Sequence, residues 1–184
     1  MSIGLFNNKL VYQTLSNIME SKKFKCILSG DSRVGKTSLI KTYLEGKFPS
    51  KIQGFNDVIV NKKFSFDGKD FFFEFKDIAD DPEEEKAVDF SIVCLSLNDN
   101  KSIQNAIKKW ASVFNLPFYI LGLKQDLIFS EEILSKIKSE VNEKLKDNKH
   151  FLGYQPLSAK NSLDHQIFEE CCRLYINKKM PEMQ

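Results

Sequence analysis

The chain has 184 residues, of which 42% are hydrophobic and 28% charged, a composition typical of one globular domain with a substantial core. Its formal net charge of +2 gives no reason to expect nucleic acid as the main partner. No apolar run approaches the roughly 20 residues of a membrane span. The four cysteines form no CxxC pair, which argues against a zinc site or a disulfide framework and favours reduced cytoplasmic thiols.

Residues 1–22 form an extension ahead of the domain that we expect at 23–180. Their apolar residues recur at the spacing of one helix face: Leu10, Val11, Tyr12, Leu15, Ile18 and Met19. This spacing predicts an amphipathic helix, which packs against its own domain or presents its face to a membrane surface or a partner protein. We therefore expect a cytoplasmic protein, with peripheral membrane attachment through this helix left open. The last residues hold no cysteine for prenylation, so no lipid anchor is expected at the C-terminus.

From residue 23 onward, strand-like and helix-like segments alternate. Strands are predicted at 25–29, 58–66, 71–76, 90–97, 117–122 and 154–157, and helices at 36–44, 102–114, 130–147 and 163–178. Asp67-Gly68 is a two-residue hairpin signal between the second and third strands. The order predicts an α/β fold with a mostly parallel six-stranded sheet, one antiparallel edge hairpin and helices on both faces. Ligands of such sheets bind at the carboxyl ends of the strands.

A phosphate-binding loop occupies residues 30–37, between the first strand and the first helix: Gly30-Asp31-Ser32-Arg33-Val34-Gly35-Lys36-Thr37. Its two glycines allow a tight turn whose N–H groups point inward, and together with the helix N-terminus they form an anion cradle. In such a loop Lys36 lies between the β- and γ-phosphates, and Thr37 offers a hydroxyl to Mg²⁺. The Arg33 side chain is either exposed or directed toward phosphate or ribose.

Three segments after later strands make the prediction more specific. Asp77 follows the third strand, where a carboxylate holds a water of the Mg²⁺ shell. Asp126, in Lys124-Gln125-Asp126, is suited to accept the N1–H and N2–H₂ donors of guanine, a pair that adenine lacks, while the Lys124 stem covers the ring. The Ala159 N–H, in Ser158-Ala159-Lys160, is placed to donate to the guanine carbonyl oxygen.

The expected cofactors are therefore GTP or GDP and Mg²⁺. Thr37 and Asp77 are the expected metal-site residues. The expected nucleotide-binding residues are Ser32, Arg33, Val34, Gly35, Lys36, Thr37, Ser38, Lys124, Asp126, Leu127, Ser158, Ala159 and Lys160.

In these segments the sequence resembles the Ras superfamily of small GTPases, closest in layout to the Rho and Rab branches. The resemblance covers about residues 23–178 and rests on the loop at 30–37, Phe48-Pro49, Asp67-Gly68, Asp77-Ile78-Ala79, Lys124-Gln125-Asp126 and Ser158-Ala159-Lys160. It implies a P-loop NTPase G domain. It also implies a nucleotide-dependent switch that serves signalling or trafficking through effector and regulator proteins, which the sequence does not name.

The chain departs from this family at the positions that sense the γ-phosphate. Phe55 stands where switch I of the family carries a threonine, and Asp80 replaces the switch II glycine. Asp81 stands at the position of the glutamine that orients the attacking water, so no residue is assigned a catalytic role. Leu123 replaces an asparagine or threonine beside the base site. GDP binding is expected to survive, while GTP hydrolysis is expected to be weak or absent.

Three functions remain to be compared. The first is a divergent small GTPase with slow hydrolysis, and the second is a nucleotide-binding scaffold that does not switch. The third, a nucleotide kinase, is disfavoured because such enzymes clamp two phosphate chains with several arginines, and this chain has only Arg33 and Arg173. The acidic run from Asp80 to Glu85 is either a solvated loop or a docking surface for a basic partner.

Overall fold

A computed structural model of the chain describes residues 23–51, 59–78, 88–113, 115–161 and 166–179. The helix predicted within residues 1–22 lies outside these ranges, as do Phe55, Asp80 and Asp81. Expectations about those positions therefore stay predictions.

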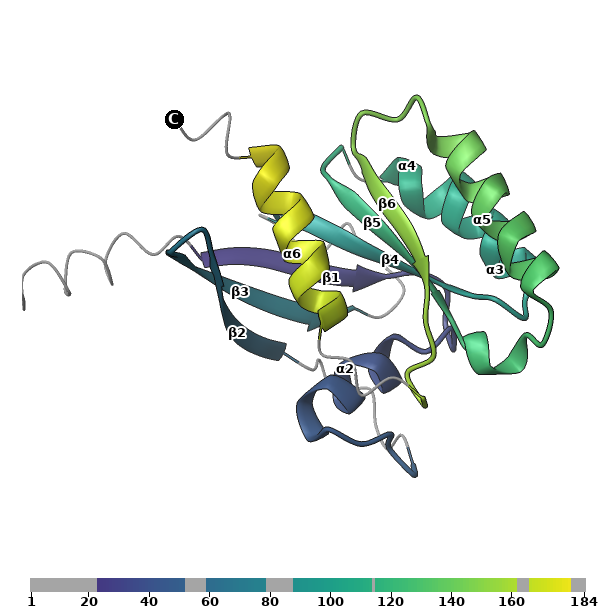
Figure 1. Ribbon diagram of the computed structural model, residues 1–184, viewed down its shortest axis with the longest axis horizontal. Coiled ribbons are helices and arrows are strands. Elements are labelled where there is room, and N and C mark those ends of the chain that lie inside the picture. Colours follow the sequence, from purple (N-terminus) through teal and green to yellow (C-terminus); the bar gives the residue numbers. More distant parts are fainter. Residues whose placement is uncertain (1–22, 52–58, 79–87, 114, 162–165, 180–184) are drawn as a thin grey trace, which may run out of the picture.

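The described residues form one six-stranded sheet with the strand order β2-β3-β1-β4-β5-β6 (Figure 1). Its strands are β1 (Lys23–Ser29), β2 (Ile59–Phe66), β3 (Lys69–Asp77), β4 (Phe90–Ser96), β5 (Phe118–Leu123) and β6 (Phe151–Pro156). All neighbouring strands are parallel except β2 and β3, which pair antiparallel. The predicted fold class, including the antiparallel edge hairpin, is confirmed.

Helical segments cover both faces of the sheet (Figure 1). They are α2 (Lys36–Glu45), α3 (Asn100–Asn105), the π-helical turn η2 (Ala106–Trp110), α4 (Ala111–Val113), the short turn η3 (Gln125–Leu127), α5 (Glu131–Leu145) and α6 (Gln166–Lys179). Helices α2 and α6 enclose one apolar core, and α3, η2, α4 and α5 enclose the other. Strands β4 and β5 are buried at every position because both of their faces are covered, which explains their continuous apolar sequence.

The hairpin and the start of α5 follow local sequence signals. Asp67 and Gly68 have φ angles of 50° and 73°, as the two central residues of a type I′ turn require. Ser130 caps α5, where its Oγ accepts the Ile133 N–H at 3.3 Å. Both predictions are confirmed.

Most predicted boundaries differ from the structure by one to three residues, and two of these differences have a local cause. The helix predicted at 102–114 begins at Asn100, because the Asp99 carboxylate caps it by accepting the N–H groups of Lys101 and Ser102, and it contains a π turn that periodicity does not reveal. Strand β6 begins at Phe151 rather than 154. The sequence pattern does not predict residues 151–153 as strand, because Gly153 interrupts the run of strand-forming residues. In the structure Gly153 has a φ of 151° and lies beside the Tyr119 ring.

Candidate nucleotide-binding site

The loop at 30–37 joins the end of β1 to the start of α2, as predicted. Gly30 has a φ of 132°, and a Cβ there would overlap the carbonyl oxygen of Cys94 in β4, so only glycine fits. Gly35, with a φ of 119°, is the N-cap of α2 and provides no side-chain cap. The first N–H groups of a helix have no partner within the helix, so this end of α2 is suited to an anion.

Lys36 is a buried cation within this loop, only 7% exposed. Its Nζ donates to the carbonyl oxygens of Gly30 at 2.8 Å and Asp31 at 3.1 Å. These partners are neutral carbonyls, so they orient the ammonium without cancelling its charge. The arrangement is suited to binding phosphate.

Two oxygen-bearing side chains meet beside the end of the loop. The hydroxyl of Thr37 donates a hydrogen bond to the carboxylate of Asp77 at the end of β3. A hydroxyl and a carboxylate are hard oxygen donors that fit Mg²⁺. Among the described residues, no group of three or more His, Cys, Asp or Glu side chains is placed to hold a metal ion. A magnesium ion here would complete its coordination shell with phosphate oxygens and water.

A hollow of about 210 Å³ lies next to the phosphate loop. Its lining residues are Val34, Gly35, Ser38, Phe48, Leu123, Lys124, Asp126, Leu127, Ala159 and Lys160. The structure thus brings eight of the predicted nucleotide-binding residues to one place. Ser158 stands behind them, and its Oγ donates to Asp126 Oδ1 at 2.6 Å, which fixes the orientation of that carboxylate.

Lys124 connects the hollow to the phosphate loop. Its Nζ donates to the Arg33 carbonyl oxygen at 2.9 Å, and its backbone has a φ of 63°, in the left-handed region. The next residue, Gln125, donates its N–H to the Leu157 carbonyl at 3.2 Å, which ties this segment to the end of β6. Ser32 and Arg33 are exposed on the loop.

Two lining residues had no predicted role in binding. Phe48, 43% exposed, follows the end of α2 and presents an aromatic ring to the hollow. An aromatic residue shortly after the C-cap Gly46 is only a weak sequence signal for a role in binding, because the other residues that line the hollow are distant in sequence. Leu123 packs beside Gly35. The sequence alone indicates only that Leu123 lacks the hydrogen-bonding side chain that the family carries at this position.

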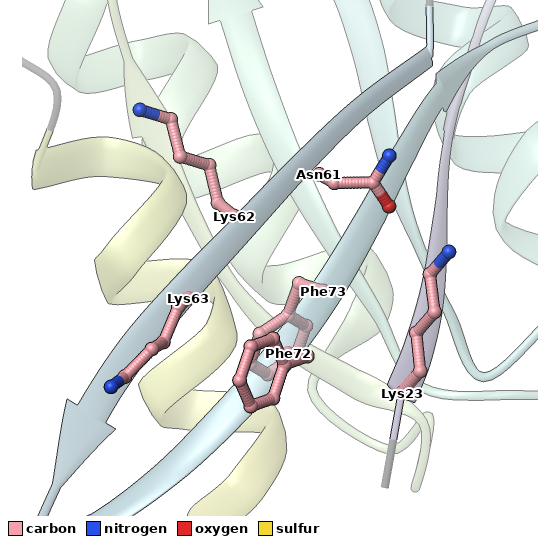
Figure 2. A pocket seen from close by; sticks show the side chains of 6 residues that line it. All are labelled: Lys23, Asn61, Lys62, Lys63, Phe72 and Phe73. Atoms are coloured by element: carbon pink, nitrogen blue, oxygen red, sulfur yellow. The ribbon is translucent and has the colours of Figure 1, made fainter. Parts of the chain in front are cut away.

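A larger hollow, of about 530 Å³, lies on strands β1, β2 and β3 and is lined by Lys23, Asn61, Lys62, Lys63, Phe72 and Phe73 (Figure 2). Lys23 pairs with Glu74 at 2.6 Å and Lys63 with Asp70 at 2.7 Å, so the charges of both lysines are balanced. The hydrogen bond from Lys63 holds the pKa of Asp70 below its usual value. Lys23 begins β1 whereas the phosphate loop follows its end, roughly 20 Å away along a seven-residue strand. This hollow is separate from the phosphate site.

The phosphate loop between a parallel strand and a helix, with a hollow at the carboxyl ends of β5 and β6, defines a P-loop protein of the α/β class. Comparison with known proteins identifies the family within this class. The model of the Ras family matches residues 25–177. The chain belongs to the Ras family of small GTPases.

Individual relatives include members of the Rab and Rho groups. The Ras-related protein Rab-9A of Rattus norvegicus is 30% identical over 175 residues, covering 84% of this chain and 83% of the relative. The Rho-related protein racI of Dictyostelium discoideum is 28% identical over 137 residues, covering 65% of each chain. The Ras-like GTP-binding protein RhoL of Drosophila melanogaster is 26% identical over 176 residues, covering 86% of this chain and 90% of the relative. No helix in the described part of the chain is long and apolar enough to cross a membrane.

Proposed function

We propose that the protein binds GDP and GTP with Mg²⁺ and acts in signalling or trafficking as a divergent small GTPase with weak or absent GTP hydrolysis. The observation that carries the guanine assignment is the Asp126 carboxylate, which Ser158 holds at the hollow beside the phosphate loop. A carboxylate accepts both the N1–H and N2–H₂ donors of guanine, whereas adenine presents no such pair. The Ala159 N–H and the Phe48 ring complete the surroundings of the base.

The phosphate chain is bound in this proposal by the loop at 30–37. Lys36 neutralises charge on the β- and γ-phosphates, and the N–H groups at the start of α2 donate to phosphate oxygens. Thr37 and Asp77, whose side chains meet at the end of the loop, would hold Mg²⁺ with their oxygen atoms. When bound, the ion neutralises charge on the phosphate oxygens.

We infer slow hydrolysis from the identity of three residues, all of which lie outside the described part of the chain. Phe55 has no hydroxyl for Mg²⁺, and Asp81 has a carboxylate in place of the water-orienting glutamine. Asp80 near a γ-phosphate adds like-charge repulsion of roughly 1–3 kcal/mol in a partly screened site. The same three residues favour the alternative function, a nucleotide-binding scaffold that does not switch.

The base assignment is tested by identifying the nucleotide that co-purifies with the chain after denaturation in perchloric acid. We expect GDP or GTP, because the Asp126 carboxylate at the hollow matches the two donors of guanine and the adjacent loop is suited to phosphate. An adenine nucleotide as the main species would contradict the guanine assignment.

Hydrolysis is tested by single-turnover conversion of bound GTP, followed by chromatography. The expected rate lies below the family's intrinsic range, which is on the order of 10⁻⁴ to 10⁻² per second. The matched variant combines Asp80→Gly with Asp81→Gln and is expected to hydrolyse faster than the natural chain. A natural rate within or above that range would exclude the scaffold and refute the proposed weak hydrolysis.

The proposal also places the protein in the cytoplasm, with attachment to a membrane surface or a partner through the helix predicted within residues 1–22 left open. Its effector and regulator proteins are not identified by the sequence.

A further inference from the structure

Asp31, the second residue of the phosphate loop, turns its carboxylate toward the helix that follows β4. Oδ2 accepts a hydrogen bond from Asn105 Nδ2 at 2.8 Å, and Oδ1 accepts one from Trp110 Nε1 at 2.8 Å. Trp110 is 2% exposed and packs in the core beneath α5. Both carboxylate oxygens thus accept hydrogen bonds from one helical segment, whose Trp110 is buried in the core.

The π turn is what brings these two donors together. Asn105 ends α3, Trp110 ends η2, and the N–H of Ala111 bonds the carbonyl of Ala106, five residues earlier. Five residues of ordinary α-helix rotate through about 500°, which would leave two such side chains about 140° apart. A π turn closes its hydrogen bonds from i to i+5 and is wound more loosely than an α-helix, so it brings Asn105 and Trp110 closer to one face. The irregularity in the helix therefore coincides with a specific contact to the phosphate loop.

The backbone of the same residue also contacts the buried lysine. While its side chain bonds α3 and η2, the Asp31 carbonyl accepts the Lys36 Nζ at 3.1 Å. The later part of the loop has other attachments, from Lys124 to the Arg33 carbonyl and from Thr37 to Asp77. Leu123 packs beside Gly35 but has no polar atom in its side chain to bond the loop. In the described part of the chain, the side-chain hydrogen bonds that join the first part of the loop to α3 and η2 are those of Asp31.

We propose that Asp31 is a positioning residue, which fastens the phosphate loop to Asn105 and Trp110 and so slows the release of bound nucleotide. This inference rests on the proposed function. The carboxylate itself does not touch phosphate in this role, since its oxygens face the helix. It holds the peptide that orients Lys36.

Charge and positioning make opposite predictions for Asp31→Asn, which gives a clear test. Removal of a negative charge near bound phosphates would by itself slow nucleotide release. Loss of a hydrogen bond to a charged acceptor loosens the loop and is expected to speed release about tenfold. Trp110→Phe removes the N–H donor without changing the charge of the loop, and its expected effect is also about tenfold.

The measurement is the rate at which methylanthraniloyl-GDP leaves the full chain in excess GDP, followed by fluorescence. If Asp31 and Trp110 act through the hydrogen bond that joins them, the double variant Asp31→Asn with Trp110→Phe releases the probe little faster than either single variant. The matched control is Gln104→Ala, because Gln104 Nε2 donates to Glu140 at 2.7 Å and joins the same helix to α5 rather than to the loop. This control is expected to lose thermal stability but keep the natural release rate.

A second readout does not require nucleotide. The chain has one tryptophan, so its indole N–H gives a single signal in a ¹H–¹⁵N correlation spectrum. Asp31→Asn is expected to shift this signal and to speed its exchange with solvent, whereas Gln104→Ala leaves it in place.

The outcomes separate this inference from the proposed function. If the natural chain retains no guanine nucleotide, the proposed function is wrong and the positioning role is lost with it. If the natural chain retains the probe, but Asp31→Asn and Trp110→Phe release it at the natural rate or more slowly, only the positioning role is refuted. Variants that release the probe faster, with the control unchanged, support it.

Discussion

At the scale of the residue, the choice of base depends on one side chain whose direction is fixed by another. Asp126 lies at the hollow, and Ser158 fixes it through a 2.6 Å hydrogen bond to Oδ1. The bond joins residues 32 positions apart, from the ends of β5 and β6. A carboxylate held in this way recognises a base by the pattern of donors on its edge rather than by shape alone.

This recognition predicts a change of specificity in Asp126→Asn. The amide has one acceptor and one donor group, so it matches the N1–H and 2-oxo groups of xanthine in place of the two donors of guanine. We expect GDP affinity to fall by about a hundredfold or more and xanthosine diphosphate to bind better than GDP, as measured by isothermal titration calorimetry.

The matched variant is Ser158→Ala, which leaves the carboxylate in place but frees its orientation. We expect it to weaken GDP binding while keeping the preference for guanine. Wild-type GDP affinity in Asp126→Asn would show that this carboxylate does not contact the base.

At the scale of the element, α2 and the phosphate loop depend on glycines for two different reasons. Gly46 ends α2 at a φ of 66°, and nothing lies within 4 Å of the position of a Cβ there. Gly30 has a φ of 132° and passes so close to β4 that a Cβ would overlap the Cys94 carbonyl. The first position requires only a left-handed backbone, whereas the second requires the absence of a side chain.

We therefore predict unequal effects of the same substitution. Gly46→Ala is expected to lower the free energy of unfolding by about 1 kcal/mol, the strain of a left-handed non-glycine residue. Gly30→Ala is expected to lower it by about 3 kcal/mol or more, because β1 and β4 must separate to admit the methyl group. Urea unfolding measures both. Gly68→Ala, at a φ of 73° with nothing near its Cβ position, is the control for the smaller effect. Equal losses in Gly30→Ala and Gly46→Ala would contradict the predicted steric overlap.

At the scale of the whole molecule, one of the two cores contains all four cysteines. Cys26 and Cys94 lie on the central strands, and Cys171 and Cys172 lie on α6. Burial raises the pKa of each thiol, to about 12 for Cys94 and well above the ordinary value of 9.0 for the other three. Burial also raises the pKa of Tyr43, which packs in the same core, to about 12.

These shifts predict a loss of stability in alkaline solution. Below about pH 8 the thiols are protonated in both states, so they cause no pH dependence. Above it the unfolded chain ionises while the folded core stays neutral, and each thiol lowers the free energy of unfolding by up to about 1.4 kcal/mol per pH unit. Urea unfolding between pH 7 and 10 in a reducing agent measures this slope. Cys94→Ala is expected to make the slope shallower, and a flat profile in the natural chain would contradict the prediction.

The sequence by itself determined the fold class, the antiparallel hairpin at one edge of the sheet and the position of the phosphate loop. These features are encoded over short stretches: Asp67-Gly68 forces a tight hairpin, the spacing of glycines shapes the loop, and continuous apolar runs mark the central strands. The predicted nucleotide-binding residues also follow strand ends, which parallel pairing brings to one edge. The roles of Phe55, Asp80 and Asp81 stay predictions, because they lie outside the described residues.

Only the tertiary structure decided which side chains from distant parts of the chain are in contact. The contact of Asp31 with Trp110 spans 79 positions, and the π turn that brings Trp110 toward the side of Asn105 is not visible in helical periodicity. Phe48 reaches the hollow only once α2 is packed on the sheet. The physical reason is the same in each case: local spacing fixes the direction of the backbone, whereas a side-chain contact requires two distant segments to be positioned within a few tenths of an ångström.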